Sequence, residues 1–175
     1  MRPARRVLLV PAGLPPHKGV PHASAEDRLE MCRLAVAGLS RIGVWDVEVL
    51  RSGRSFTVDT LLRFRAERPA DTPFLLLGWD AAVQIRSWDR WEQVLELAEL
   101  IVFPRPGLPE PGTRDLGRAG LSSARLTVCE EETPEVSATE LRALLVDGGA
   151  LGELVPAGVE DYIRAHHLYE RQLGG

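Results

Sequence analysis

The sequence lacks asparagine altogether and contains a single lysine, Lys18, so that nearly all of its positive charge comes from arginine. Its two cysteines, Cys32 and Cys129, are too far apart for the spacing of a zinc site or a local disulfide framework. Free thiols are typical of a reducing compartment, so we expect a cytoplasmic location. No apolar run approaches the about 18–20 residues of a membrane-spanning helix, which excludes that class of membrane protein.

The overall amino-acid composition is that of a folded, mildly acidic domain. The 175 residues are 45% hydrophobic and 26% charged, which excludes a disordered chain. At about 100–200 residues per domain, this length predicts one domain over residues 1–175. The 21 basic and 25 acidic residues give a net charge of −4, which argues against a nucleic-acid-binding protein because such proteins usually carry a basic excess.

Short apolar runs alternate with helical patterns along the chain. Continuous apolar runs, typical of strands buried on both faces, predict strands at 6–10, 42–50, 74–77, 100–103 and 126–129. Apolar periodicity and capping residues predict helices from Ser24, over 57–67, from Asp80, from Asp89 to Leu97, from Ser137 to Leu145 and from Pro156 to His166. The stretch 105–120, rich in proline and glycine, is predicted to be a loop. This alternation predicts an α/β fold, a parallel sheet with helices on both faces.

Polar residues follow the carboxyl ends of the predicted strands, where open parallel sheets bind ligands. One cleft lined by five loops is therefore expected. The segments that would line it are Pro15–Lys18, Ser52–Thr60, Gly78–Asp80 with Trp88, Arg105–Gly107 and Val136–Arg142.

The segment Ser137–Arg142 is the most informative of the five. Hydroxyls at a helix N-terminus, free backbone N–H groups and an arginine one turn later together favour an anion site. The alternative is structural: Ser137 and Glu140 form an S-x-x-E capping box, and Arg142 is a solvated side chain. The segment alone does not decide between the two.

Each of the other candidates also has a structural alternative. His17 and Lys18 could contact phosphate or be exposed loop residues held by the neighbouring prolines. Trp88 could stack on an aromatic ring or pack onto the sheet. Asp80 could bind ribose hydroxyls or cap the next helix. The sequence contains no G-x-S-x-G, P-loop, G-x-G-x-x-G or H-E-x-x-H motif, so recognition of phosphate esters is the chemistry that remains.

Taken in order, six segments resemble the bacterial nicotinate-nucleotide adenylyltransferases, which belong to the nucleotidylyltransferase superfamily and have a Rossmann-like fold. The match covers nearly the whole chain, and the order of the segments makes it specific. The segments are VPAGxPPHK (Val10–Lys18), SxxSFTVDT (Ser52–Thr60), GxD…W (Gly78–Trp88), RPG (Arg105–Gly107), VSATELR (Val136–Arg142) and VPxxVxxYIxxxxLY (Val155–Tyr169). Three positions depart from the family pattern: Phe56, Asp89 and Ala138.

The resemblance implies transfer of the adenylyl group of ATP to nicotinic acid mononucleotide, which gives deamido-NAD and pyrophosphate without a covalent enzyme intermediate. It implies that Mg²⁺ accompanies ATP and that no protein metal site is needed. Its expected partners are these two substrates, with no nucleic acid or membrane; assembly into a homo-oligomer is left open. The ATP-binding residues implied are Gly78 and Asp80 at ribose and Ser137, Thr139 and Arg142 at phosphate. The substrate-binding residues implied are Thr57 at the nicotinate carboxylate, Trp88 at its ring, and His17, Lys18 and Arg105 at phosphates.

The family pattern also begins with a strand, a GxFDPxHxGH loop and a helix that these 175 residues do not contain. The resemblance therefore implies a fold without its first, central strand and first helix, and leaves the catalytic residues unknown because the histidines of that loop are absent. Two interpretations stay open. In one, the sequence starts at an internal methionine, and about 30 residues, one strand–helix unit, precede it. In the other, a natural truncation has left an inactive mononucleotide-binding protein or a fragment without function.

Overall fold

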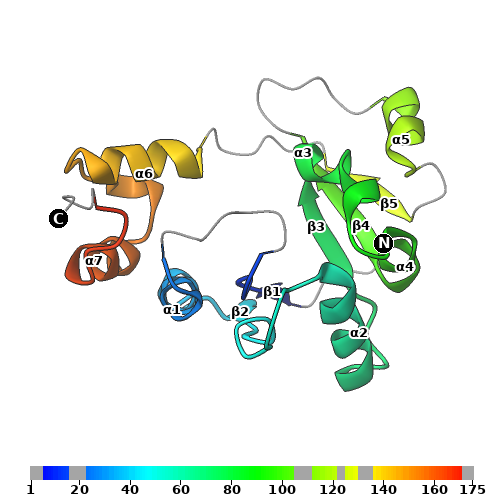
Figure 1. Ribbon diagram of the computed structural model, residues 1–175, viewed down its shortest axis with the longest axis horizontal. Helices are drawn as coiled ribbons and strands as arrows, with labels where there is room; N and C mark the ends of the chain where they lie inside the picture. The colour runs from blue at the N-terminus through cyan, green and yellow to red at the C-terminus, as the bar shows by residue number, and fades with distance from the viewer. Residues whose placement is uncertain (1–5, 16–22, 105–111, 122–124, 130–135, 171–175) are drawn as a thin grey trace. The chain divides into compact units, whose positions relative to one another are not determined.

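Figure 1 shows the computed structural model of the chain, in which strands and helices alternate as the sequence predicts. The chain divides into two compact units. Unit 1 comprises Met1–Ser55 and Val136–Gly175, and unit 2 comprises Phe56–Glu135. The single domain expected over residues 1–175 stays a prediction. The residues that the structure describes are 6–15, 23–104, 112–121, 125–129 and 136–170.

Unit 1 contains a two-stranded parallel sheet. Strand β1 (Val7–Leu9) pairs with strand β2 (Ile42–Val44), and the chain passes between them through helix α1 (Ala25–Ala35). Parallel neighbours need such a crossover because the end of the first strand and the start of the second lie at opposite edges of the sheet. The start of α1 is as predicted: the Ser24 hydroxyl accepts a hydrogen bond from the backbone N–H of Asp27, whose carboxylate accepts one from the backbone of Ser24.

Two details of the predicted strands in unit 1 are wrong. The strand expected over 42–50 ends at Val44, and the last bond of this ladder runs from the Trp45 N–H to the Leu9 carbonyl at 2.9 Å. The reason is that the chain turns after Trp45: the Leu50 N–H donates to the Asp46 carbonyl at 3.0 Å and the Arg51 N–H to the Glu48 carbonyl at 3.3 Å, so these groups bond within the turn and not to a neighbouring strand. Strand β1 is half-buried along its length, not buried on both faces, because β2 is its one strand partner in the described residues.

The apolar core of unit 1 is helical. Helices α6 (Ala138–Val146) and α7 (Ala157–Ala165) follow one another near the C-terminus, joined through the 3₁₀ turn η2 (Gly152–Leu154), and α7 packs against α1 (Figure 1). The buried members of this core are Leu145, Leu151, Val159 and Ile163, with Met31 and Leu34 of α1 packed against them. Residues from the two ends of the described chain therefore share one core.

Unit 2 is built on three parallel strands: β3 (Phe74–Gly78), β4 (Glu99–Phe103) and β5 (Leu126–Val128), in the order β3-β4-β5 (Figure 1). Each lies within one residue of its predicted position. Leu77 and Val102 are opposite each other in the register and both are buried, so one face of this sheet carries the core. The α/β class and the parallel pairing are confirmed, although the five strands form two sheets and not the one expected.

Four of the helical segments around the core of unit 2 precede β4 in the chain. They are α2 (Thr57–Glu67), α3 (Trp79–Ala82), the 3₁₀ turn η1 (Ile85–Ser87) and α4 (Trp91–Leu97), and α2 packs against α4. Helix α2 has the predicted bounds. The largest fully buried side chains of this core are Val58, Ile85, Val94, Leu100, Leu121 and Val102. Each contributes about 1.5–3 kcal/mol as an upper estimate when removed from water.

The loop predicted over 105–120 is wrong in its second half, where helix α5 (Thr113–Ala119) forms. The Asp115 carboxylate accepts a hydrogen bond from the backbone N–H of Gly112 at 3.2 Å, which fixes the first turn. Gly120 ends the helix in the left-handed region at φ 79°. The many glycines and prolines nearby concealed these start and stop signals, and the burial of Ala119 stabilises the short helix.

Candidate functional site

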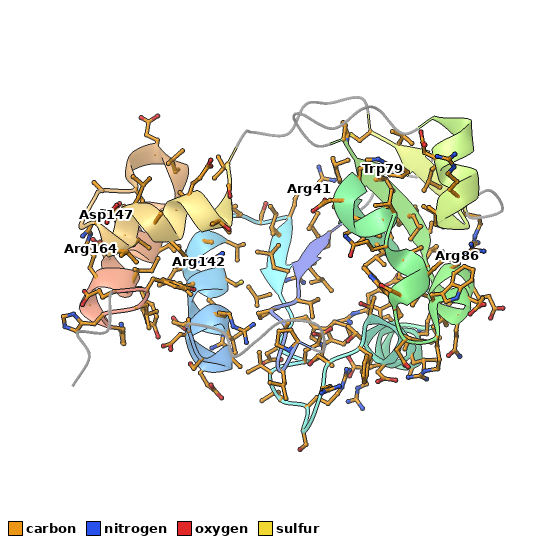
Figure 2. The ribbon with its side chains drawn as sticks, turned by 45° about the horizontal axis from the view of Figure 1, so that its top comes forward. Arg41, Trp79, Arg86, Arg142, Asp147 and Arg164 are labelled. Carbon is orange, nitrogen blue, oxygen red and sulfur yellow. The ribbon has the colours of Figure 1, made fainter. Side chains whose placement is uncertain are left out.

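The N-terminus of α6 in unit 1 carries three of the predicted phosphate-binding residues. Ser137 is the N-cap, and its Oγ accepts a hydrogen bond from the backbone N–H of Thr139 at 3.2 Å. The Arg142 guanidinium, labelled on α6 in Figure 2, donates to Thr139 Oγ1 at 3.3 Å. A helix N-terminus with two hydroxyls and a guanidinium beside it is suited to an anion.

Of the capping box predicted for Ser137 and Glu140, only the Ser137 cap is confirmed. Ser137 caps α6, but its hydroxyl is bonded at the second residue of the helix and not at Glu140. The reciprocal bond of a capping box is therefore not among the hydrogen bonds of the described residues. Thr139 is exposed, and Arg142 is partly exposed, so both can reach a ligand from solvent.

Gly78 and Asp80 lie at the carboxyl end of β3 in unit 2. Gly78 is the last residue of the strand and the N-cap of α3, and Asp80 is an exposed residue of the first turn of that helix. The N-cap position that the sequence offered to Asp80 thus belongs to Gly78. A carboxylate in a first helical turn is favoured by the helix dipole and stays accessible to hydroxyl donors.

Thr57 and Trp88, the residues expected at the nicotinate, are both in unit 2. Thr57 is the first residue of α2, whose N-cap, Phe56, makes no side-chain capping bond. The first turn of α2 therefore keeps backbone N–H groups that no cap side chain satisfies. Trp88 follows η1 and packs against the core cluster that contains Val58 of α2, but it is only partly buried. Packing explains one part of the indole surface and leaves another part exposed.

The structure adds a feature here that the sequence did not suggest. The Arg90 guanidinium donates through Nη2 to Oδ1 of Asp59 in the first turn of α2 and through Nε to Oδ2 of Asp89, the latter at 2.8 Å. These hydrogen bonds, that to Asp89 first and that to Asp59 second, raise the pKa of Arg90. The segment that follows Trp88 is thereby joined to the helix that begins with Thr57.

No sequence signal would have found this pair readily. Asp59 and Arg90 are 31 positions apart, and Arg90 adopts a left-handed backbone conformation at φ 46°, ψ 47°, which sequence statistics assign to glycine and asparagine. The other predicted contacts, His17, Lys18 and Arg105, lie outside the described residues. The single cleft expected from five loops therefore stays a prediction.

The described residues contain no group of three histidine, cysteine, aspartate or glutamate side chains that could hold a metal ion. They also contain no helix with the length and hydrophobicity needed to cross a bilayer. A hollow of about 260 Å³ in unit 2 is lined by Trp79, Val83, Asp115, Arg118 and Ala119, none of which is a predicted site residue. Figure 2 labels Trp79 on α3, beside this hollow.

The chain is similar to known proteins along most of its length. The cytidylyltransferase-like family model matches residues 3–144. The probable nicotinate-nucleotide adenylyltransferase of Pseudomonas paraeruginosa (strain DSM 24068 / PA7) is 41% identical over 92% of this chain and 81% of its own length. That of Acidithiobacillus ferrooxidans (strain ATCC 23270 / DSM 14882 / CIP 104768 / NCIMB 8455) is 36% identical over 94% of this chain and 82% of its own.

Two solved structures share the fold. The nicotinic acid mononucleotide adenylyltransferase of Plasmodium falciparum complexed with NaAD superposes with a TM-score of 0.75 at 20% identity, over 94% of this chain and 82% of the other. The same enzyme complexed with APC gives a TM-score of 0.72 at 19% identity, with the same coverage. At this level of identity the likeness establishes the Rossmann-like fold.

Proposed function

Because the chain belongs to the cytidylyltransferase-like family and, within it, to the nicotinate-nucleotide adenylyltransferases, we propose that it transfers the adenylyl group of ATP to nicotinic acid mononucleotide. The products would be deamido-NAD and pyrophosphate. The observation that carries the proposal is the 41% identity with the Pseudomonas paraeruginosa relative over 92% of this chain. We also propose a cytoplasmic location, in keeping with the free thiols of Cys32 and Cys129.

We assign the ATP phosphates to the N-terminus of α6. The backbone N–H groups and the positive end of the helix dipole favour an anion there, and the exposed Thr139 hydroxyl can donate to it. The Arg142 guanidinium, already bonded to Thr139, adds a charge-assisted donor. Gly78 and Asp80 would face a nucleotide ribose, where the carboxylate accepts hydrogen bonds from hydroxyl groups.

We assign the nicotinate to the start of α2. Its ring carboxylate would accept hydrogen bonds from the Thr57 hydroxyl and from the uncapped N–H groups of the first turn. Trp88, partly exposed, would stack on the ring. An amide at the same place would carry no charge and would gain less from the helix dipole, so this arrangement supports a preference for the acid.

The proposed chemistry is one in-line displacement. A phosphate oxygen of nicotinic acid mononucleotide forms a bond to the α-phosphorus of ATP, the bond from that phosphorus to the β-phosphate bridging oxygen breaks, and pyrophosphate leaves. Mg²⁺ would enter bound to ATP as part of the substrate, as the resemblance to the family implies. His17, Lys18 and Arg105 are proposed to contact phosphates. The chain's described contribution is to bind and orient.

A second candidate is binding of mononucleotides without turnover, because the roles proposed for the described residues are those of binding and orientation. Isothermal titration of the chain with nicotinic acid mononucleotide and with Mg–ATP, beside a pyrophosphate-release assay, separates the two. Binding with release supports the transferase, and binding without release supports the second candidate. A folded chain that binds neither ligand contradicts both.

A further inference from the structure

Two carboxylates are close in sequence to the residues of the proposed nicotinate site. Asp59 is two positions after Thr57 in the first turn of α2, and Asp89 directly follows Trp88. Both would repel the ring carboxylate of nicotinic acid mononucleotide. Arg90 pairs with each of them, so that its positive charge lies between two negative charges at the edge of the site.

The backbone of Arg90 indicates that its side chain has a specific role. At φ 46° and ψ 47° it is in the left-handed region, where a residue with a Cβ is strained and glycine is not. A turn that only had to lead into α4 would be more stable with glycine or asparagine at this position. The arginine is therefore kept there at a conformational cost, and the contacts that accompany this cost are those to Asp59 and Asp89.

The exposure of these side chains shows whether the Arg90 charge matters more for folding stability or for ligand binding. Arg90, Asp59 and Asp89 are 46%, 35% and 41% exposed. Ion pairs so accessible to water contribute little to folding stability. The local charge, in contrast, acts on any anion bound within a few ångströms, because that distance is shorter than the Debye length. Removal of the guanidinium should thus change ligand preference more than stability.

We propose that Arg90 is a specificity-determining residue: by offsetting one of the two negative charges of Asp59 and Asp89, it allows the start of α2 to accept a mononucleotide whose ring bears a carboxylate. This inference rests on the proposed function, since it requires the nicotinate to bind at Thr57 and Trp88. Arg90 itself need not touch the substrate. Its effect is on the ratio of the affinities for the acid and the amide, and not on mononucleotide binding as such.

The test is a titration of the 175-residue chain and its variants with nicotinic acid mononucleotide and with nicotinamide mononucleotide at low ionic strength. Arg90→Gly relieves the backbone strain and removes the charge, so it folds normally and lowers the acid-to-amide affinity ratio about 3–10-fold. Adding Asp59→Asn to Arg90→Gly recovers part of that ratio. Arg90→Lys, which keeps the charge, retains most of it.

Arg63→Ala is the matched control. It also removes one positive charge from unit 2, but Arg63 pairs with Glu67 at the other end of α2, and the affinity ratio should stay at the wild-type value. Asp59→Asn alone should raise the ratio, which provides a second variant if Arg90→Gly does not fold. An equal loss of affinity for both mononucleotides in Arg90→Gly, or an unchanged ratio, overturns the inference alone. A wild-type chain that binds neither mononucleotide overturns the proposed function and this inference with it.

Discussion

The phenolic hydroxyl of Tyr162 on α7 donates a hydrogen bond to Oδ1 of Asp27 on α1, at 3.0 Å and across 135 positions of sequence. The other oxygen of this carboxylate accepts a hydrogen bond from the Ser24 hydroxyl at 2.7 Å. Asp27 therefore caps the start of α1 and joins this helix to α7. Partial burial, and secondly the bond to Asp27, raise the pKa of Tyr162, so its hydroxyl stays a donor at neutral pH.

The first prediction concerns this bond. Tyr162→Phe removes the donor and keeps the ring, and we expect the free energy of unfolding to fall, because the acceptor is a charged carboxylate that loses one of its hydrogen bonds. Urea denaturation measures it. Tyr169→Phe is the control, since the Tyr169 hydroxyl has no hydrogen-bond partner within the described part of the chain, and its effect should be smaller. Equal losses for the two variants would contradict the prediction.

The second prediction is a pH dependence. The hydrogen bond from Ser24 and, more weakly, that from Tyr162 hold the pKa of Asp27 below its ordinary value of 3.8. The unfolded chain therefore takes up this proton at a higher pH than the folded chain does. The stabilisation is fully present above pH 3.8 and is lost as the pH falls through the lower, folded-state pKa.

Wild type and Asp27→Asn should accordingly differ by a constant free energy of unfolding near neutral pH, and the difference should shrink in strong acid. Urea titrations at a series of pH values check this. If the Asp27 difference persists unchanged in acid, the carboxylate does not stabilise the fold in this way.

A third prediction compares two glycines of unit 1. A Cβ at Gly13 would lie 2.2 Å from the carbonyl oxygen of Glu48, which is backbone and cannot move aside. Gly13→Ala should therefore destabilise the chain by about 2 kcal/mol or more. Gly158, in α7, has ordinary room, with Leu34 Cδ2 at 3.9 Å, and Gly158→Ala should stabilise the helix by about 0.5 kcal/mol. Thermal unfolding that shifts in the same direction for both would refute this.

The fourth prediction tests the phosphate site. Arg142→Ala should raise the Kd for ATP about tenfold, because a charge-assisted hydrogen bond is lost. Isothermal titration measures the Kd, and circular dichroism shows whether the variant is folded. Arg33→Ala serves as the control for net charge: it lies on α1 in an exposed ion pair with Glu30 and should leave ATP binding unchanged. A folded Arg142→Ala variant with wild-type affinity would remove α6 from the proposed ATP site.

Local signals in the sequence accounted for much of the fold. Helix α2 was predicted with its bounds because its apolar periodicity is clear and Pro69 follows its end. The cap of α1 at Ser24 was predicted because the capping box is a contact within one turn. The strand expected over 42–50 is too long because the chain turns after Trp45, where the Leu50 N–H donates to the Asp46 carbonyl. The apolar residues of that segment do not distinguish a strand from a turn, so the pattern alone does not show where the ladder stops.

The candidate site shows the same limit. Ser137 at the start of α6 could be predicted, since capping is local. The pairing of Arg90 with Asp59 could not, because it joins residues 31 positions apart and depends on a left-handed backbone at an arginine. Sequence patterns record favourable local conformations, and a strained residue held by distant contacts is by nature an exception to them.

The division into two units affects how the chain folds while it is being synthesised. Unit 1 is assembled from two stretches that flank unit 2 in the sequence, and α7, which packs against α1, is among the last segments made. At about 5–20 residues per second, Met31 and Leu34 emerge from the ribosome on the order of ten seconds before the apolar residues of α7 that will cover them. Unit 2 comes from one continuous stretch and has no such delay. The nascent N-terminal stretch is thus the part of the chain that would gain most from a ribosome-associated chaperone.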